Sequence, residues 1–361
     1  MYIAGSLACL GLGAYFYTVM PSARPAPVAD QSRNEAFAAL AKQLAGKTDQ
    51  DTNPASPPEA TPPAIETNSS IVFAGDIMLG RYVGEVVKAN GAGYPFLKIK
   101  DAVSSADEAI ANLEGPLTKI NNDPGNQMRF NFDPALAGEL SSAGFDAVSL
   151  ANNHALDQGA PGLSDTQADL KAAGLGYFGD PARADGPVYQ FTADGKKIAV
   201  LGFQMVYGKL DSVGYAAAIA AAKKEADFVI VMPHWGTEYK HEANAIQINS
   251  AHAFIDAGAD MIVGSHPHVV EGIEIYKNRP IFYSLGNLIF DQYFSKDTQE
   301  GLMLRLNFSG DQGSVDLLPL EIPKSQPVLV DGDKKAKTLQ EVASLSDPAL
   351  KDQILTGNIN F

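Results

Sequence analysis

The sequence predicts an α/β fold with two layers of mixed sheet flanked by helices. Short apolar runs recur between residues 71 and 263, helical patterns lie between them, and four later segments alternate like antiparallel strands. Apolar runs of this length suit strands buried on both faces. Their alternation with helices implies much parallel sheet. With 361 residues, 45% of them hydrophobic, the chain is long enough for one large domain or two.

The elements follow in chain order. The buried strands are predicted at 71–75, 109–113, 145–150, 227–232 and 259–263, and the alternating strands at 269–276, 279–285, 301–308 and 314–322. The helices are predicted at 133–143, 162–173, 215–224 and 244–257, the last ending before Gly258, a typical helix stop. The folded domain is therefore expected at 69–322. Residues 323–361, with a helical stretch near 338–345, are interpreted as a C-terminal surface extension.

The N-terminal segments have a different character. Residues 1–20, MYIAGSLACLGLGAYFYTVM, carry no Asp, Glu, Lys or Arg, and about 20 apolar residues suffice to span a bilayer as a helix. The absence of a basic start favours an uncleaved anchor over a cleaved signal peptide. Residues 21–68 are rich in Pro and Ala and are predicted to be a disordered linker. We expect a single-pass protein of the cell membrane with its folded domain outside the cytoplasm.

Charge and cysteine content exclude several classes of protein. The net charge of −15 argues against nucleic acid as a partner, because nucleic acid attracts basic surfaces. An anionic substrate remains compatible, since bound divalent cations reverse the local field of a site. Cys9 is the single cysteine, so an intramolecular disulfide and a cysteine zinc cluster are both excluded.

Histidines and acids collect where the predicted strands end. All six histidines fall between His154 and His268. The strand-end residues are Asp76, Glu114, Asn153, His154, His234, His266 and His268. Ligands bind at the carboxyl ends of strands in open α/β sheets. Mixed His, carboxylate and amide donors suit Mn, Fe or Zn better than Ca or Mg. The sequence thus predicts a site for one or two divalent transition metal ions.

Several ordered motifs support a family resemblance. They are FAGDIMLG at 73–80, NLEGP at 112–116, LANNHALDQG at 150–159, HWGTEY at 234–239, and the stretch 255–287 with DAGAD and YSLGN. Over roughly residues 70–322 the chain resembles the capsule-synthesis CapA family, which is associated with poly-γ-glutamate capsule biosynthesis. The resemblance implies a calcineurin-like metallophosphoesterase fold, a four-layer α/β/β/α sandwich.

The phosphoesterase pattern implies a role for each matching residue. One metal would be held by Glu114, Asn153, His234 and His266, and the other by Asp76, Glu114 and His268, with Glu114 shared. His154 would be the catalytic acid. The pattern normally has a second histidine two residues after the first aspartate, and Met78 stands there. This departure leaves the second metal short of one ligand and keeps a one-metal site open.

Two functions stay open. The first is a metal-dependent hydrolase that uses metal-activated water on a phosphoester or on an amide of an anionic polymer. The second is a polymer-handling or export component whose metal is structural or binds polymer carboxylates. Polymer synthesis needs an ATP-dependent ligase, and the chain has no Gly-x-x-x-x-Gly-Lys-Ser/Thr motif. The resemblance therefore implies capsule synthase subunits as partners.

Other residues have weaker interpretations. Asp157, Glu238 and Asp291 are candidates to accept the second ring N–H of a ligand histidine. Arg81 and Arg129 are candidates to hold an anionic substrate. Asn287 is either a pocket residue or part of a tight turn. His241, in a polar loop, and His252, within a predicted helix, are interpreted as surface or structural residues. Taken singly, Asp76 would fit a helix cap or turn equally well, and a turn is an alternative for Asn153-His154.

Overall fold

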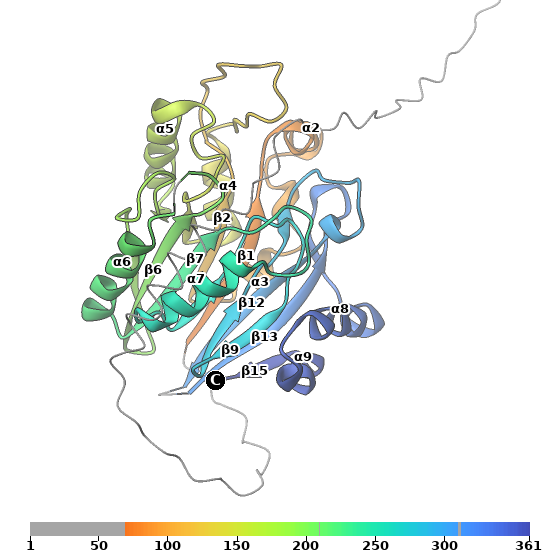
Figure 1. Cartoon of the computed structure of the whole chain (residues 1–361). Helices are drawn as coiled ribbons and strands as arrows, with labels where there is room; N and C mark the ends of the chain where they lie inside the picture. The colour runs from red at the N-terminus through yellow and green to blue at the C-terminus, as the bar shows by residue number, and fades with distance from the viewer. Residues whose placement is uncertain (1–68, 209, 310–311) are drawn as a thin grey trace, which may run out of the picture.

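A computed structural model describes residues 69–208, 210–309 and 312–361 (Figure 1). The expected anchor at 1–20 and linker at 21–68 lie outside the described residues. Among the described helices, none combines the length and the apolar character needed to cross a bilayer.

The larger sheet has nine strands with β1 in its interior. The strand order is β14-β13-β12-β1-β2-β3-β4, with β11 paired to β1 and β15 paired to β13. β1 runs parallel to β2, β2 to β3 and β3 to β4, whereas β12 and β13 are antiparallel neighbours. The strands are β1 (Ser69–Ile77), β2 (Glu108–Leu113), β3 (Ala147–Ser149), β4 (Gly176–Phe178), β11 (Asn287–Ile289), β12 (Glu300–Ser309), β13 (Gln312–Glu321), β14 (Val328–Leu329) and β15 (Asn358–Asn360).

The smaller sheet has six strands in the order β5-β6-β7-β8-β10-β9. Its central strands β6, β7 and β8 are parallel, and antiparallel strands close both edges. The strands are β5 (Tyr189–Ala193), β6 (Lys196–Gln204), β7 (Phe228–His234), β8 (Met261–Val263), β9 (Ile273–Tyr276) and β10 (Arg279–Phe282).

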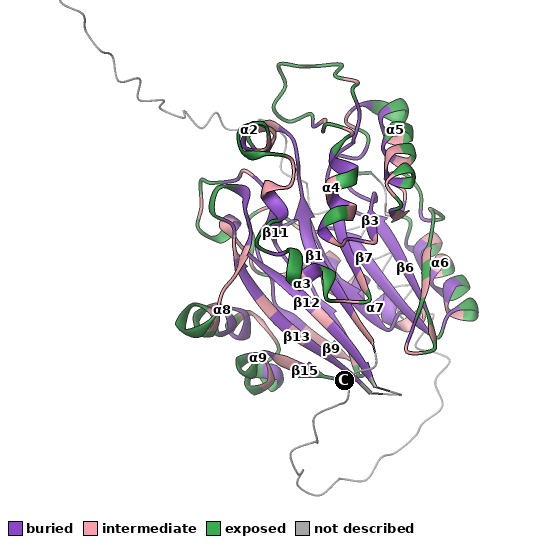
Figure 2. Cartoon of the chain, turned by 180° about the vertical axis from the view of Figure 1, so that it is seen from behind, coloured by how far each residue is buried: buried purple, intermediate pink, exposed green. Residues whose placement is uncertain are grey.

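Helices cover the outer face of each sheet, as Figure 2 shows from behind. α2–α5 pack on the larger sheet, and α6 and α7 pack on the smaller one. The helices are α2 (Arg81–Asn90), α3 (Lys100–Ser104), α4 (Leu136–Ala143), α5 (Gly159–Ala172), α6 (Ser212–Glu225), α7 (Ala245–Asp256), α8 (Gly332–Leu345) and α9 (Lys351–Thr356). The predicted four-layer α/β/β/α arrangement is confirmed.

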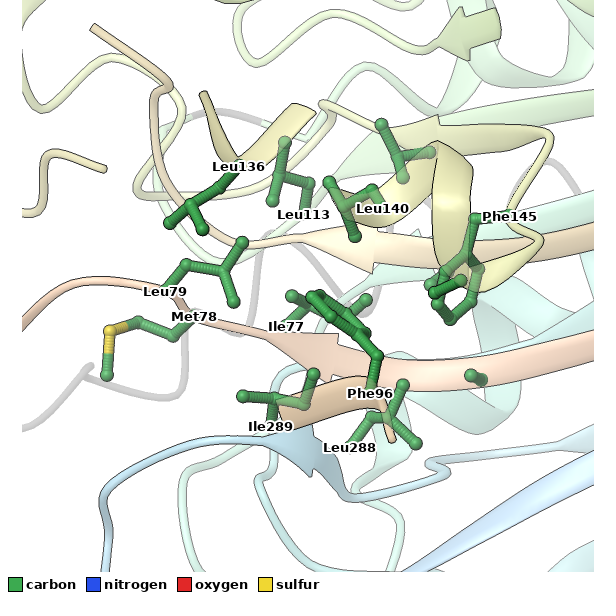
Figure 3. Close-up of a cluster of buried hydrophobic side chains, with 14 of the residues drawn as sticks. Ile77, Met78, Leu79, Phe96, Leu113, Leu136, Leu140, Phe145, Leu288 and Ile289 are labelled. Atoms are coloured by element: carbon green, nitrogen blue, oxygen red, sulfur yellow. The ribbon is translucent and has the colours of Figure 1, made fainter. Parts of the chain in front are cut away.

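The side chains of β1 show how the layers form. Because successive side chains of a strand point to opposite faces, Ile71 and Phe73 enter the core between the two sheets, whereas Val72 and Ala74 face the helices. All four are essentially inaccessible to solvent. Burying an aliphatic or aromatic side chain of this size contributes about 1.5–3 kcal/mol. β1 therefore joins two hydrophobic clusters, and Figure 3 shows the one beneath α4.

Several elements differ from the sequence prediction. β4, β5 and β6 were not predicted, although Ile198–Phe203 is an apolar run like the others. The strand expected at 269–276 begins only at Ile273, after an irregular segment. Residues 323–361 are more than a surface extension: β14 and β15 extend the larger sheet through β13, and α8 and α9 bury Leu339, Val342 and Ile354 against the core.

Candidate metal centre

The predicted site residues come together at the carboxyl ends of both sheets. Asp76 lies at the end of β1, and Glu114 directly follows β2. His234 is the last residue of β7. Asn153 and His154 follow β3, and His266 and His268 follow β8. The larger sheet therefore supplies the carboxylates, and the smaller sheet supplies most of the imidazoles.

Asp76 is a buried carboxylate that is held in place by hydrogen bonds. Its Oδ1 accepts from Asn112 Nδ2 at 2.8 Å, and its Oδ2 accepts from the backbone N–H of His266 at 3.2 Å. Asn112 and Asn287 are its register neighbours on β2 and β11. The second of these bonds ties β1 of the larger sheet to the loop after β8 of the smaller one.

Glu114 is fully buried, and neither of its carboxylate oxygens has a hydrogen-bond partner among the described residues. Burial raises the pKa of this carboxyl well above its ordinary value, and the neighbouring Asp76 adds to the shift. His268 Nε2 at 3.7 Å and His154 Nε2 at 3.8 Å are near its Oε1. A buried carboxylate without partners is costly unless a cation compensates it.

His234 faces Asn153 across the space between the sheets. Asn153 Oδ1 lies 2.7 Å from His234 Nε2, and Ser265 Oγ lies 2.9 Å from His234 Nδ1. Burial lowers the pKa of His234 well below its ordinary value, so the ring is neutral. Asn112 Nδ2 also lies 3.3 Å from His234 Nδ1. In the tautomer with the proton on Nδ1, directed at Ser265, His234 Nε2 and the Asn153 oxygen would be able to coordinate one metal.

The loop that carries His266 and His268 is bent rather than extended. Both residues have left-handed backbone conformations, with φ of 98° and 61°, which cost non-glycine residues of order 1–3 kcal/mol and gather at functional sites. Burial lowers the pKa of His266, and its Nδ1 has no partner among the described residues. Burial also lowers the pKa of His268, but the charges of Glu114 and Asp76 outweigh it and raise the value to about 9.

The His154 ring is held in place by two contacts. Its Nδ1 lies 2.7 Å from Asp157 Oδ2, and its ring stacks on Phe130 with centroids 4.0 Å apart. Asp157 Oδ2 also accepts from the Phe130 backbone N–H at 2.7 Å. The two contacts fix the ring and direct Nε2 toward Glu114. Asp157 was expected to accept from a ligand histidine, and the structure places it against His154 instead.

Two groups of donors each bring their ligand atoms within 4.8 Å of one another: Asp76 with Glu114 and His234, and Glu238 with His266 and His268. Glu238 was expected only as an outer hydrogen-bond acceptor. It reaches the centre from the loop after β7, where the left-handed Gly236 (φ 92°) turns the chain back. A sequence has no periodic signal for such a turn, apart from the glycine itself.

The sequence prediction did not include most of the amide side chains that hydrogen-bond to the candidate ligands. Asn287 Oδ1 lies 3.0 Å from His268 Nδ1, while Asn287 Nδ2 donates to Gln292 and to the Thr298 carbonyl. Asn287 thus has the pocket role rather than a turn role alone. The sequence could have identified Asn112, because residues two apart in extended backbone point to the same side, and Asn112 lies two residues before Glu114.

Three further candidates lie away from the ligand groups. Asp291 pairs with the Arg81 guanidinium instead of a ligand histidine. His252 stacks on Tyr276 and contacts Glu274 Oε1 at 2.7 Å. His241 contacts the Val270 carbonyl and Asp297 near the surface. Neither histidine joins either ligand group in the described part of the chain.

The donor set fits a divalent transition metal. The unpartnered oxygens of Glu114 and the unpartnered His266 Nδ1 are buried polar atoms that only a bound group would satisfy. Neutral imidazoles and carboxylates are the forms that coordinate a metal. Asp76, Glu114, Asn153, His234, His266 and His268 would hold it.

Comparison with known proteins identifies the family of this chain. The family model for the bacterial capsule synthesis protein PGA_cap matches residues 70–292. The chain belongs to this family. It is 34% identical to the PGA biosynthesis protein CapA of Bacillus subtilis (strain 168) over 78% of this chain and 80% of that protein. Against the capsule biosynthesis protein CapA of Bacillus anthracis, the identity is 32% over 72% of this chain and 68% of that one.

Among solved structures, the fold is similar to a hypothetical protein from Thermus thermophilus. The TM-score is 0.44 at 18% identity, with 72% of this chain and 96% of that chain covered.

A cleft of about 550 Å³ adjoins the centre in this member of the family. It lies between α2 and the segment 118–134, the gold loop at the top of Figure 1. Phe130, which stacks on His154, and Arg81, whose guanidinium lies 4.8 Å from the Phe130 ring centroid, form its border with the metal centre. Lys119 and Arg129 line it as well, and in the described part of the chain neither forms an ion pair.

Proposed function

We propose that this protein is a metal-dependent hydrolase that acts on an anionic polymer or phosphoester in the biosynthesis of a poly-γ-glutamate or related capsule. The observation that carries the proposal is the buried, unpartnered Glu114 carboxylate, surrounded by histidines and faced by His154. Membership of the PGA_cap family and the names of the CapA relatives support the capsule role.

The chain's own residues divide the chemistry between them. A divalent metal held by the ligand set would act as a Lewis acid that stabilises developing negative charge. His154 holds a proton at Nε2 and delivers it to the leaving atom, a role worth about 10²–10⁴-fold in rate. Asp157 keeps the ring in the tautomer and orientation that this transfer needs. Phe130 covers one face of the ring and limits access of water.

The cleft supports an anionic substrate. Lys119 and Arg129 lie along it, in the described residues neither forms an ion pair, and Arg81, which is paired with Asp291, lies at its border. Lys88 and the acids Glu85, Asp123 and Asp133 line it as well. Arginine binds carboxylate and phosphate bidentately. A cleft of this size holds a ligand of several polar units, and pockets of about 300–1,000 Å³ are the usual range for small-molecule sites. We propose that the substrate lies along this cleft and reaches the metal past Phe130.

Two features of the cellular setting belong to the proposal. The apolar segment at 1–20 supports attachment to the cell membrane, with the folded domain outside the cytoplasm. Subunits of a capsule synthase are the proposed partners, because the chain lacks a motif for ATP-dependent ligation.

Met78 favours the alternative function, a polymer-handling or export component. A centre with an incomplete ligand set is suited to a polymer-handling or export component in which the metal is structural or binds polymer carboxylates. The two functions differ in what His154 does, because only a hydrolase requires its proton.

The test is turnover of the purified full-length chain on p-nitrophenyl phosphate, bis-p-nitrophenyl phosphate and poly-γ-glutamate, with metal content measured on the same sample. We expect hydrolysis that falls about 10²–10⁴-fold in His154→Ala with unchanged metal content. His252→Ala is the matched control, since His252 lies outside both ligand groups. Metal-loaded wild-type protein without turnover on any of the three substrates would favour the polymer-handling alternative.

A further inference from the structure

Met78 supplies no ligand to the metal centre. Its side chain is fully buried and belongs to the hydrophobic cluster between the larger sheet and α2–α5. Figure 3 draws it next to Ile77 and Leu79. Its sulfur accepts a hydrogen bond from the Gly80 backbone N–H at 3.2 Å. Position 78 therefore contributes packing, and any replacement for the histidine of the phosphoesterase pattern must come from another segment.

Glu238 reaches the centre from the opposite sheet. Its carboxylate oxygen and the ligand nitrogens of His266 and His268 all lie within 4.8 Å of one another. His268 is also near the Asp76 and Glu114 carboxylates, at 3.4 and 3.7 Å. Glu238 therefore lies beside His266 and beside His268, and His268 is the residue that also contacts Asp76 and Glu114.

The segment around Glu238 is fixed at several points. The Tyr239 backbone N–H donates to the Pro267 carbonyl at 2.8 Å, directly between His266 and His268. Gln292 Nε2 donates to the Tyr239 hydroxyl at 3.2 Å, and Asn244 Nδ2 donates to Thr237 Oγ1 at 3.3 Å. Contacts on both sides of Glu238 hold its backbone against the histidine loop, which is the preorganisation expected of a ligand.

The local charges are unbalanced without a cation. His268 Nδ1 lies 3.4 Å from Asp76 Oδ2, His268 Nε2 lies 3.7 Å from Glu114 Oε1, and a carboxylate oxygen of Glu238 lies within 4.8 Å of a ring nitrogen of His268. Within the described residues none of the three carboxylates forms an ion pair with a lysine or arginine, and the nearby Arg81 guanidinium is paired with Asp291. Three carboxylates around one imidazole form an environment that a divalent cation stabilises.

We propose that Glu238 is a direct ligand of the metal held by Asp76, Glu114 and His268, in the place of the histidine that Met78 replaces. The proposal rests on the metal centre of the proposed function but does not require hydrolysis. The centre then has a full ligand set for two metals, with an anionic oxygen donor where the phosphoesterase pattern has a neutral nitrogen donor. Carboxylate donors suit Mn²⁺ better than imidazole donors do.

The test is titration of the full-length apo chain with Zn²⁺ and Mn²⁺ against a metal-sensing chelator, for the wild type and three variants. Glu238→Gln removes the charge and keeps the size. Glu238→Asp keeps the charge but withdraws the carboxylate by one methylene. Glu242→Gln is the matched control, because Glu242 is exposed and lies four residues along the same loop. The melting temperature of each metal-free variant checks that the fold is intact.

We expect two bound metals in the wild type and in Glu242→Gln, with the weaker site lowered in affinity at least about 10-fold in both Glu238 variants. If Glu238→Asp kept the affinity of the wild type and only Glu238→Gln lost it, Glu238 would act through its charge at a distance. That result would overturn its assignment as a ligand. Wild-type affinity in Glu238→Gln, or a wild type that binds fewer than two metals, would also overturn it. The proposed function fails on a different observation, the absence of turnover.

Discussion

The two groups of metal donors are built in different ways. Asp76, Glu114 and His234 lie at or directly after strand ends, where neighbouring strands fix the backbone. Glu238, His266 and His268 lie on loops, and the two histidines have left-handed backbone conformations. Strand-end donors are positioned by the sheet itself. Loop donors depend on a few hydrogen bonds and on one glycine, so they are expected to be the more easily displaced.

Removal of Glu114 should break the first group and abolish both sites. Glu114→Ala is expected to lower metal affinity by more than about 100-fold, since loss of outer-shell partners alone costs about 10–100-fold. Elemental analysis after dialysis against a defined free-metal concentration measures it, with Glu341→Ala on the exposed face of α8 as the control. Retention of two metals in Glu114→Ala would contradict the assignment of Glu114 as the shared ligand.

Displacement of the loop that carries Glu238 should affect the loop donors more than the strand-end donors. Gly236 has φ of 92°, and a Cβ at this position would lie 2.8 Å from the Gln247 side chain. Gly236→Ala is expected to destabilise the fold by about 1–2 kcal/mol and to weaken the metal site that includes Glu238, while the site of Glu114, Asn153, His234 and His266 keeps its metal. Gly208→Ala, also left-handed but with open space around it, is the control for backbone strain alone. Equal weakening of both sites would show that the groups are not independent.

A buried acid beneath the loop site should make stability depend on pH. Burial raises the pKa of Glu271 to about 8, and Gln247 Nε2 donates to its Oε2 at 2.6 Å. Because the folded state keeps the proton that the unfolded chain releases near pH 4.5, stability is full below that pH and falls as the pH rises toward 8.

The matched variant for this effect is Glu271→Gln, which keeps an acceptor for Gln247. Between pH 5 and pH 8, the variant is expected to lose about 1–3 kcal/mol less of its free energy of unfolding than the wild type does. Urea unfolding of the metal-free protein at the two pH values measures the effect. The same pH dependence in wild type and variant would assign it to another group, for which half-buried Glu108, with a pKa raised by burial to about 7, is the first candidate.

The difference between the two groups also explains what the sequence could predict. Asp76, Glu114, Asn153 and His234 follow apolar runs, and parallel strands bring their ends to one edge, so pattern alone locates them. Glu238 was assigned only an outer role because the turn at Gly236 leaves no periodic signal. His266 and His268 were predicted from their place after an apolar run, but the left-handed backbone at each of them has no signal in the sequence.

The elements of the fold also divide into those that the sequence pattern predicts and those that it does not. β1, β2 and β7 were predicted because both of their faces are buried and their sequences are continuously apolar. β15 was not predicted, because Asn358-Ile359-Asn360 carries a single apolar residue and is a strand only through its pairing with β13. α8 was predicted only in part, because its apolar residues Leu339, Val342 and Ala343 are few and its first turns are polar.

The hydrogen bond from the His266 backbone to Asp76 joins two sheets that share no strand. Neither sheet alone contains a complete set of donors, so the site exists only after the two layers have docked. A partly folded chain consequently lacks the complete set of donors. A bound ion would connect the two layers, and chelation should therefore accelerate unfolding more than it slows folding.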